Sequence, residues 1–165
     1  MVVPREGDER VTAFCLGVAQ ATPTERMDMV RRGVTPEWLG RLARALRIAE
    51  EHLMLYLGLD RRKVLNRLAE GGRLDPHDSE AVIATANLAG YALTLRGRAD
   101  PAQQPETADM LRQLGTWLRT PRPELERRAP IQYLDVAEGR ALVARLWGDL
   151  HAITCESVGP DVSPR

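Results

Sequence analysis

Residues 50–72, EEHLMLYLGLDRRKVLNRLAEGG, decide the fold of the N-terminal part of this chain. A short helix with apolar side chains ends at Leu57, and Gly58-Leu59-Asp60 supplies a turn. Asp60 can cap a second helix that begins at Arg61, because aspartate is among the residues preferred at that position. A glycine in a tight turn between two helices is typical of a helix-turn-helix unit. The stretch therefore predicts two helices that cross at a steep angle.

The second helix of this unit carries its cations on one side. We expect Val64, Leu65 and Leu68 to face the core, which leaves five polar side chains outside: Arg61, Arg62, Lys63, Asn66 and Arg67. Three consecutive cations at a helix N-terminus oppose the helix dipole, so an anion bound there would stabilise them. Arg and Asn also read guanine and adenine edges in the DNA major groove. The pattern favours DNA contact through these five residues; the alternative is a solvated basic helix that only packs.

Helix starts and stops recur along the rest of the chain, and strand signals are nearly absent. Thr35-Pro36-Glu37 and Asp75-Pro76 are typical of helix starts, whereas Gly33 and Gly71-Gly72 are typical of helix ends. We therefore predict an all-α fold, with helices at residues 24–32, 36–46, 50–57, 61–70, 77–95, 107–119 and 137–153. Apolar residues at helical spacing, from Val82 to Leu93, predict a core face whose small residues permit close helix approach.

Composition bounds the class of protein. The chain has 165 residues, 44% of them apolar, enough for one ordinary domain or two small ones that share a core. The net charge is zero, but residues 31–73 hold ten Arg or Lys against five acids, and residues 74–110 hold two against six. Because local patches set phosphate affinity, the basic block supports DNA contact. The aromatic content of 4% argues against a stacking platform for single-stranded RNA.

Catalytic and metal-binding patterns are missing from the sequence. Cys15 and Cys155 stand far apart and predict two reduced thiols, and His52, His77 and His151 have no metal-ligand spacing. There is no GxGxxG, Walker A or GxSxG motif. We expect a protein that is not an enzyme and binds no cofactor or metal. With no apolar run of about 18 to 20 residues and no signal-peptide pattern at its start, the chain is expected to be cytoplasmic and to have no membrane partner.

Two longer stretches resemble a known family. Residues 33–88 resemble the Xre-like half of antitoxins from the RES–Xre toxin–antitoxin family, with Gly33, Leu57-Gly58, Arg67, Gly72, Leu74 and Ser79 at the corresponding places. Residues 117–153 are similar to the Xre/MbcA/ParS toxin-binding domain, with Trp117-Leu118, Pro121, Leu125, Pro130, Leu134-Asp135, Gly139, Val143 and Leu146 in order. The family usually has glycine where this chain has Glu126-Arg127, and arginine where Asn66 stands.

The resemblance implies an antitoxin that covers the active site of a RES-domain, NAD-consuming toxin. It also implies repression of its own operon through operator DNA, and a homodimer within a larger toxin–antitoxin complex. On this view residues 1–23 are a flexible extension, 24–110 an Xre-like helix-turn-helix domain, 111–155 a small helical toxin-binding domain and 156–165 a flexible tail. A stand-alone helix-turn-helix transcription regulator with a C-terminal dimerisation domain is the alternative.

In the expected toxin-binding domain, polar residues that could contact the toxin alternate with apolar residues expected in the core. Trp117, Leu125 and Leu146 are expected in the core, because each lies in an apolar stripe or beside prolines. We expect six exposed side chains to contact the toxin: Arg127, Arg128, Gln132, Tyr133, Glu138 and Arg140. A carboxylate such as Glu138 would pair with cations of an NAD-binding cleft, and the arginines with acids at its rim.

Overall fold

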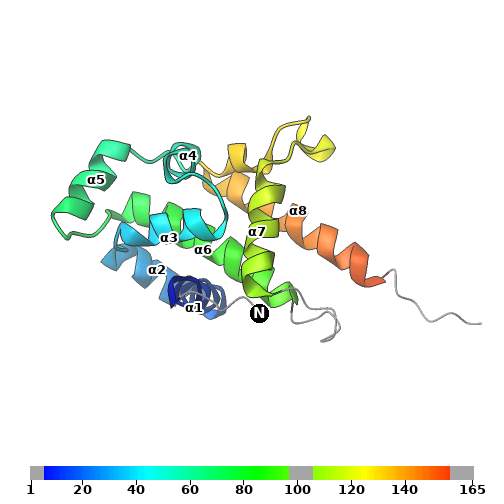
Figure 1. Ribbon diagram of the computed structural model, residues 1–165, viewed down its shortest axis with the longest axis horizontal. Helices are drawn as coiled ribbons and strands as arrows, with labels where there is room; N and C mark the ends of the chain where they lie inside the picture. Colours follow the sequence, from blue (N-terminus) through cyan, green and yellow to red (C-terminus); the bar gives the residue numbers. More distant parts are fainter. Residues whose placement is uncertain (1–5, 97–105, 157–165) are drawn as a thin grey trace, which may run out of the picture.

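In the computed structural model, which describes residues 6–96 and 106–156, the regular elements are helices, as predicted (Figure 1). They are α1 (Glu6–Gln20), α2 (Pro23–Arg32), α3 (Glu37–Ala45), α4 (Glu50–Tyr56), α5 (Arg61–Ala69), α6 (Pro76–Arg96), α7 (Thr107–Arg119) and α8 (Ala137–Glu156), with short 3-10 turns η2 (Pro123–Leu125) and η3 (Pro130–Tyr133) before α8. The all-α prediction is confirmed for these residues, and the seven predicted helices agree with α2 to α8 within three residues at each end.

The N-terminal residues correct one expectation. Instead of a flexible extension over 1–23, α1 packs along α6 and buries Val11, Cys15 and Val18. These three residues are spaced by four and three, as one buried helical face requires. Burial raises the pKa of the Cys15 thiol to about 12, so it stays a protonated, structural thiol. Residues 1–5 and 157–165 lie outside the described residues, so the expectation of a flexible tail is not tested.

The helix α6 lies in the middle of the molecule and contacts α1, α2, α7 and α8 (Figure 1). Its predicted apolar face is buried from Val82 to Leu93, and its small residues let neighbours approach closely. At Gly90 an added Cβ would overlap the carbonyl group of Cys15. None of the helices that the structure describes combines the length and the apolar character needed to cross a membrane.

One hydrophobic core extends through both halves of the chain. Leu39 and Leu53 of the N-terminal half belong to the same buried cluster as Leu114 of α7 and Trp147 of α8. The ring of Trp117 meets that of Trp147 edge-on, with centroids 5.1 Å apart. Trp117 and Leu125 are buried as expected, whereas Leu146 is half-buried. The helix α7 also crosses the end of α3, where Gly115 lies directly against the backbone of Leu46.

Two glycines on helices should therefore respond oppositely to the same substitution. Gly115→Ala would drive a Cβ into the Leu46 carbonyl, and we expect it to lower the free energy of unfolding by about 1–3 kcal/mol, as overpacking does. Gly17 of α1 has open space around its Cα, so Gly17→Ala should be neutral or stabilise by up to about 1 kcal/mol. Urea unfolding measures both. Equal effects of the two substitutions would contradict the close packing of α7 on α3.

Candidate functional site

The turn between α4 and α5 has the predicted cap. Gly58 adopts φ 69°, and the amide of Leu59 donates to the carbonyl of Met54. The carboxylate of Asp60 accepts from the amides of Arg62 and Lys63, at 2.9 and 3.2 Å. The amides at the start of α5 are thus already bonded to a carboxylate of the chain itself. The basic first turn needs no external anion to satisfy these amides.

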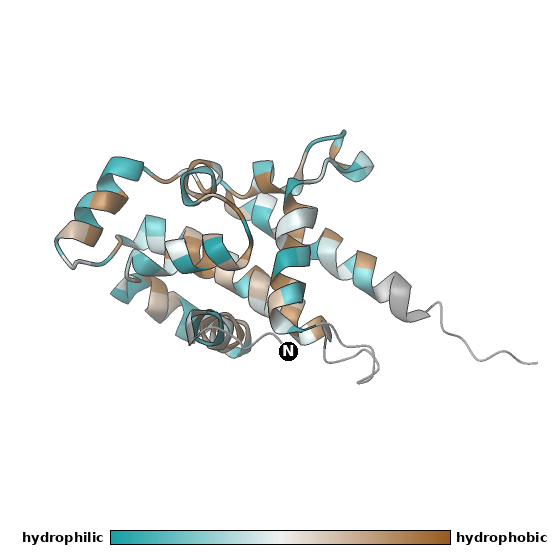
Figure 2. Ribbon diagram, viewed as in Figure 1, coloured by the Kyte–Doolittle hydropathy of each residue, from teal (hydrophilic) through white to brown (hydrophobic). Residues whose placement is uncertain are grey.

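The core-facing side of α5 is narrower than the sequence predicts. Val64 is 1% exposed, but Leu65 and Leu68 are 42% and 43% exposed, so their expected burial is wrong. The helix lies at the edge of the molecule and packs mainly on α4, so only one row of its side chains meets a neighbour (Figure 1). Apolar positions on α5 are visible at this edge in Figure 2. Helical spacing identifies an apolar face without showing whether another element covers it.

All five predicted DNA-contact residues are exposed on α5, but three of them already have partners. Arg61 pairs with Glu51 of α4 at 2.7 Å, and Arg67 lies 3.7 Å from Glu70. Lys63 bonds to the carboxylate of Asp75 and lies 3.4 Å from Oδ2 of Asp78. Within the part of the chain that the structure describes, the side chains of Arg62 and Asn66 have no such partner.

Lys63 connects α5 to the start of α6. Its hydrogen bond to Asp75 raises the pKa of Lys63, and the pKa of Asp75 is lowered by the amide of Asp78 and then by Lys63. Asp78 is buried, and its Oδ2 accepts no hydrogen bond, so the ammonium of Lys63 is the cation that compensates it. A packing role therefore accounts for Lys63, whereas Arg62 and Asn66 are free to contact a ligand.

The second group of predicted residues lies in the connection between α7 and α8. The loop 122–128 is closed by backbone hydrogen bonds from the Arg122 amide to Arg128 and from the Arg127 amide to Arg122. Glu126 and Arg127 have φ of 53° and 64°, a left-handed conformation that glycine adopts more easily. These are the two residues that stand where the resembled family usually has glycine. The loop therefore holds a strained backbone at an exposed, charged tip.

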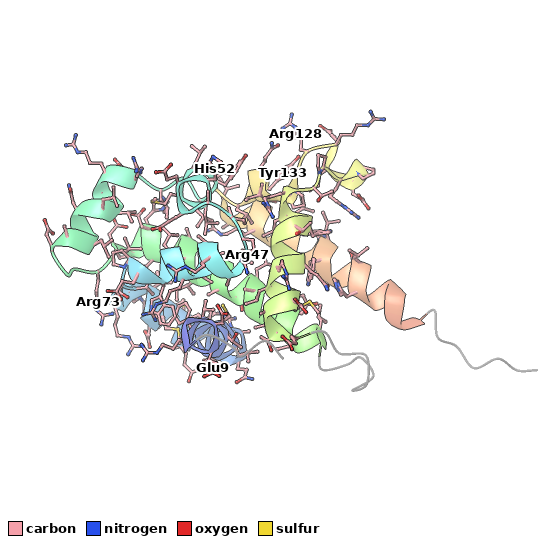
Figure 3. All side chains as sticks on the ribbon, viewed as in Figure 1. Glu9, Arg47, His52, Arg73, Arg128 and Tyr133 are labelled. Carbon is pink, nitrogen blue, oxygen red and sulfur yellow. The ribbon has the colours of Figure 1, made fainter. Side chains whose placement is uncertain are left out.

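A groove of about 480 Å³ lies between α4 and this connection. Arg127, Arg128 and Gln132 line it together with three residues that were not expected at a site: His52 and Tyr56 of α4, and Arg119 of α7. Five further residues complete the lining: Ile48, Ala49, Pro121, Ala129 and Ile131. Figure 3 shows His52, Arg128 and Tyr133 on the same side of the molecule. The spacing of His52 and Tyr56 puts them on one helix face, but nothing in the sequence tells what faces them.

The other three residues predicted to contact the toxin differ in their exposure. Glu138 is exposed at the start of α8, and Tyr133 is half-buried, with its hydroxyl 3.5 Å from the carbonyl oxygen of Leu125. Arg140 is not an exposed contact residue, since only 11% of its side chain is accessible. Its guanidinium donates to Glu80 of α6 at 2.8 Å and to the carbonyl of Leu134 at 2.9 Å. Arg140 therefore joins α8 to α6, and its expected exposure is wrong.

The chain is similar in sequence to a known antitoxin. No protein-family model matches the chain. The chain is 31% identical over 126 residues to the Prs ADP-ribosylating antitoxin of Sphingobium sp. (strain YBL2). The aligned region covers 76% of this chain and 77% of the relative.

Removing Lys63 and removing Arg62 should have different consequences. Lys63→Ala leaves the buried carboxylate of Asp78 without a cation and should lower the urea midpoint clearly, whereas Arg62→Ala should leave the midpoint unchanged.

Asp75→Ala should lower the free energy of unfolding by about 1 kcal/mol, because it removes the acceptor for the Asp78 amide at the start of α6.

The lowered pKa of Asp75 also determines how the stability of the fold changes with pH. The carboxylate stabilises the fold above its ordinary pKa, and this contribution is lost as the pH falls through the lowered value. Urea midpoints measured from neutral to acidic pH should therefore fall less steeply for Asp75→Asn than for the wild-type chain. Parallel curves would contradict the role of the Asp75 carboxylate.

Proposed function

The chain belongs to the family of antitoxins that includes the Sphingobium protein, and from this premise we propose that it neutralises a RES-domain toxin by covering the toxin's active site. The observation that carries the proposal is the 31% identity to a named antitoxin over about three quarters of both chains. Covering an active site requires a buried interface of about 1,200–2,000 Å² and no chemistry from the antitoxin. The chain is thus a binding protein, and the toxin supplies the reaction.

The chemistry of the relative's name supports the proposed class of toxin. That name joins the word antitoxin to ADP-ribosylation, a reaction in which NAD is the ordinary donor of ADP-ribose. The resemblance of residues 33–88 and 117–153 to RES–Xre antitoxins also implies a toxin that consumes NAD. The proposed contacts with it are Arg127, Arg128, Gln132, Tyr133 and Glu138, which belong to the C-terminal half.

We propose that α4 and α5 form a helix-turn-helix unit with a second role in DNA binding. Arg62 and Asn66 are the two outward polar residues of α5 without partners among the described residues, and Arg67 has only a long contact to exposed Glu70. Such a surface fits operator DNA upstream of the toxin–antitoxin operon, which the chain would repress as a homodimer in complex with its toxin. Lys63 contributes less, because its charge is compensated by Asp75 and Asp78.

Co-expression with the protein encoded in the adjacent reading frame tests the antitoxin role. That protein alone should arrest growth and deplete cellular NAD, and the full-length chain should restore both and copurify with it. Deleting residues 111–165 is not a clean test, because α7 and α8 contribute to the common core. A neighbour that neither arrests growth nor binds the chain would contradict the proposal and leave a stand-alone regulator as the explanation.

Two substitutions on α5 test the DNA role. Asn66→Ala should weaken operator binding by about 1–3 kcal/mol if its amide reads a base. Arg62→Ala should weaken binding to all sequences and make its salt dependence shallower. Arg10→Ala, at an exposed position of α1, is the control and should change neither quantity. Retention of a promoter fragment is measured at several salt concentrations, with and without toxin. Binding that none of these substitutions alters would exclude α5 as the DNA-contacting helix.

A further inference from the structure

The groove between α4 and the α7–α8 connection has an unbalanced charge. Its eleven lining residues include three arginines and one histidine, and none of them is Asp or Glu. Arg119 donates from Nε to the carbonyl oxygen of Gly115 at 3.1 Å, a bond that leaves its charge uncompensated. Arg127 and Arg128 make no ion pair within the described part of the chain. A partner with carboxylates or phosphates would supply the missing opposite charge.

Apolar side chains lie among these polar and charged groups in the lining. Ala49 and Pro121 are exposed lining residues and Tyr56 is half-buried, whereas Ile48 and Ile131 are almost fully buried. Protein interfaces commonly combine an apolar centre with Tyr and Arg around it. A DNA backbone offers phosphates, but it has no apolar side chain that could cover the apolar residues of the groove. The composition therefore favours a protein segment over nucleic acid.

The rim of the groove is preorganised. The left-handed residues Glu126 and Arg127 are held by the backbone hydrogen bonds of the 122–128 loop, and Leu125 anchors the loop in the interior. A side chain on a fixed backbone loses less conformational entropy on binding than one on a loose loop. The backbone that carries Arg127 and Arg128 is thus fixed in place beside α4.

We propose that this groove binds an acidic segment of the toxin that also carries an apolar side chain, so that α4 forms one wall of the toxin-binding site. The proposal rests on the proposed antitoxin function and extends it to the N-terminal half of the chain. His52 and Tyr56 contact the toxin segment from α4, while Arg127, Arg128 and Gln132 contact it from the opposite side. Toxin binding and the helix-turn-helix therefore share the helix α4.

The test measures the affinity of full-length variants for the purified toxin from the adjacent reading frame. His52→Glu and Arg128→Glu place an acid on each wall, and both positions are exposed, so the fold should tolerate them. Each should weaken toxin binding by about tenfold or more, and Arg128→Lys should keep most of the affinity. Arg10→Glu carries the same charge change as Arg128→Glu, but on α1, at the opposite edge of Figure 1, and should stay close to wild type. Circular dichroism and urea midpoints confirm that each variant is folded.

The possible outcomes distinguish the groove proposal from the proposed antitoxin function. If the wild-type chain restores growth and binds the toxin but both reversals bind as tightly as Arg10→Glu, the groove proposal fails and the antitoxin function stands. If the reversals weaken promoter retention and leave toxin affinity intact, the groove contacts DNA phosphates, and the proposal is also overturned. If wild type does not bind the toxin at all, both proposals fail. If Arg128→Glu weakens toxin binding and His52→Glu does not, α4 does not contact the toxin, and the proposal that α4 forms one wall of the site is wrong.

Discussion

The burial of α6 is the constraint on which the rest of the structure depends. A helix that is apolar around much of its circumference must be covered from several directions, and α1, α2, α7 and α8 supply that cover. Close approach is possible only where side chains are minimal, as at Gly90 against α1. Because α6 takes neighbours from both ends of the chain, the two halves that the sequence suggests as separate domains are joined through one interior.

Whether a charged side chain on a helix can bind a ligand depends on the partners that it already has within the protein. The basic run at the start of α5 suggests a surface open to phosphate, yet Asp60 satisfies its amides and Lys63 compensates two acids at the start of α6. The positive charge still available on α5 is therefore mainly that of Arg62, together with the weakly paired Arg67. By contrast, the cations of the α7–α8 connection face a groove without acids, so their charge is directed toward a partner.

Much of the fold could be predicted from the sequence, because caps, prolines and glycines mark helix ends locally. The bounds of α2 to α8 and the buried face of α6 follow from such signals. The errors at Leu65, Leu68 and Arg140 share one cause: periodicity describes a single element, whereas burial depends on a second element that covers it. Leu65 and Leu68 have helical spacing but remain exposed, and Arg140 is largely hidden where it contacts Glu80 and the carbonyl of Leu134. The groove beside His52 depends on segments more than sixty residues apart, which no local pattern can place together.

The continuous interior has a consequence for the lifetime of the protein in the cell. Small domains with a single core generally unfold in one cooperative step. A protease that degrades the unfolded chain would then destroy the α5 surface and the α7–α8 connection in the same event. If the proposed functions hold, repression and neutralisation would decay with one common half-life, and turnover could not leave behind a fragment that silences the operon without restraining the toxin.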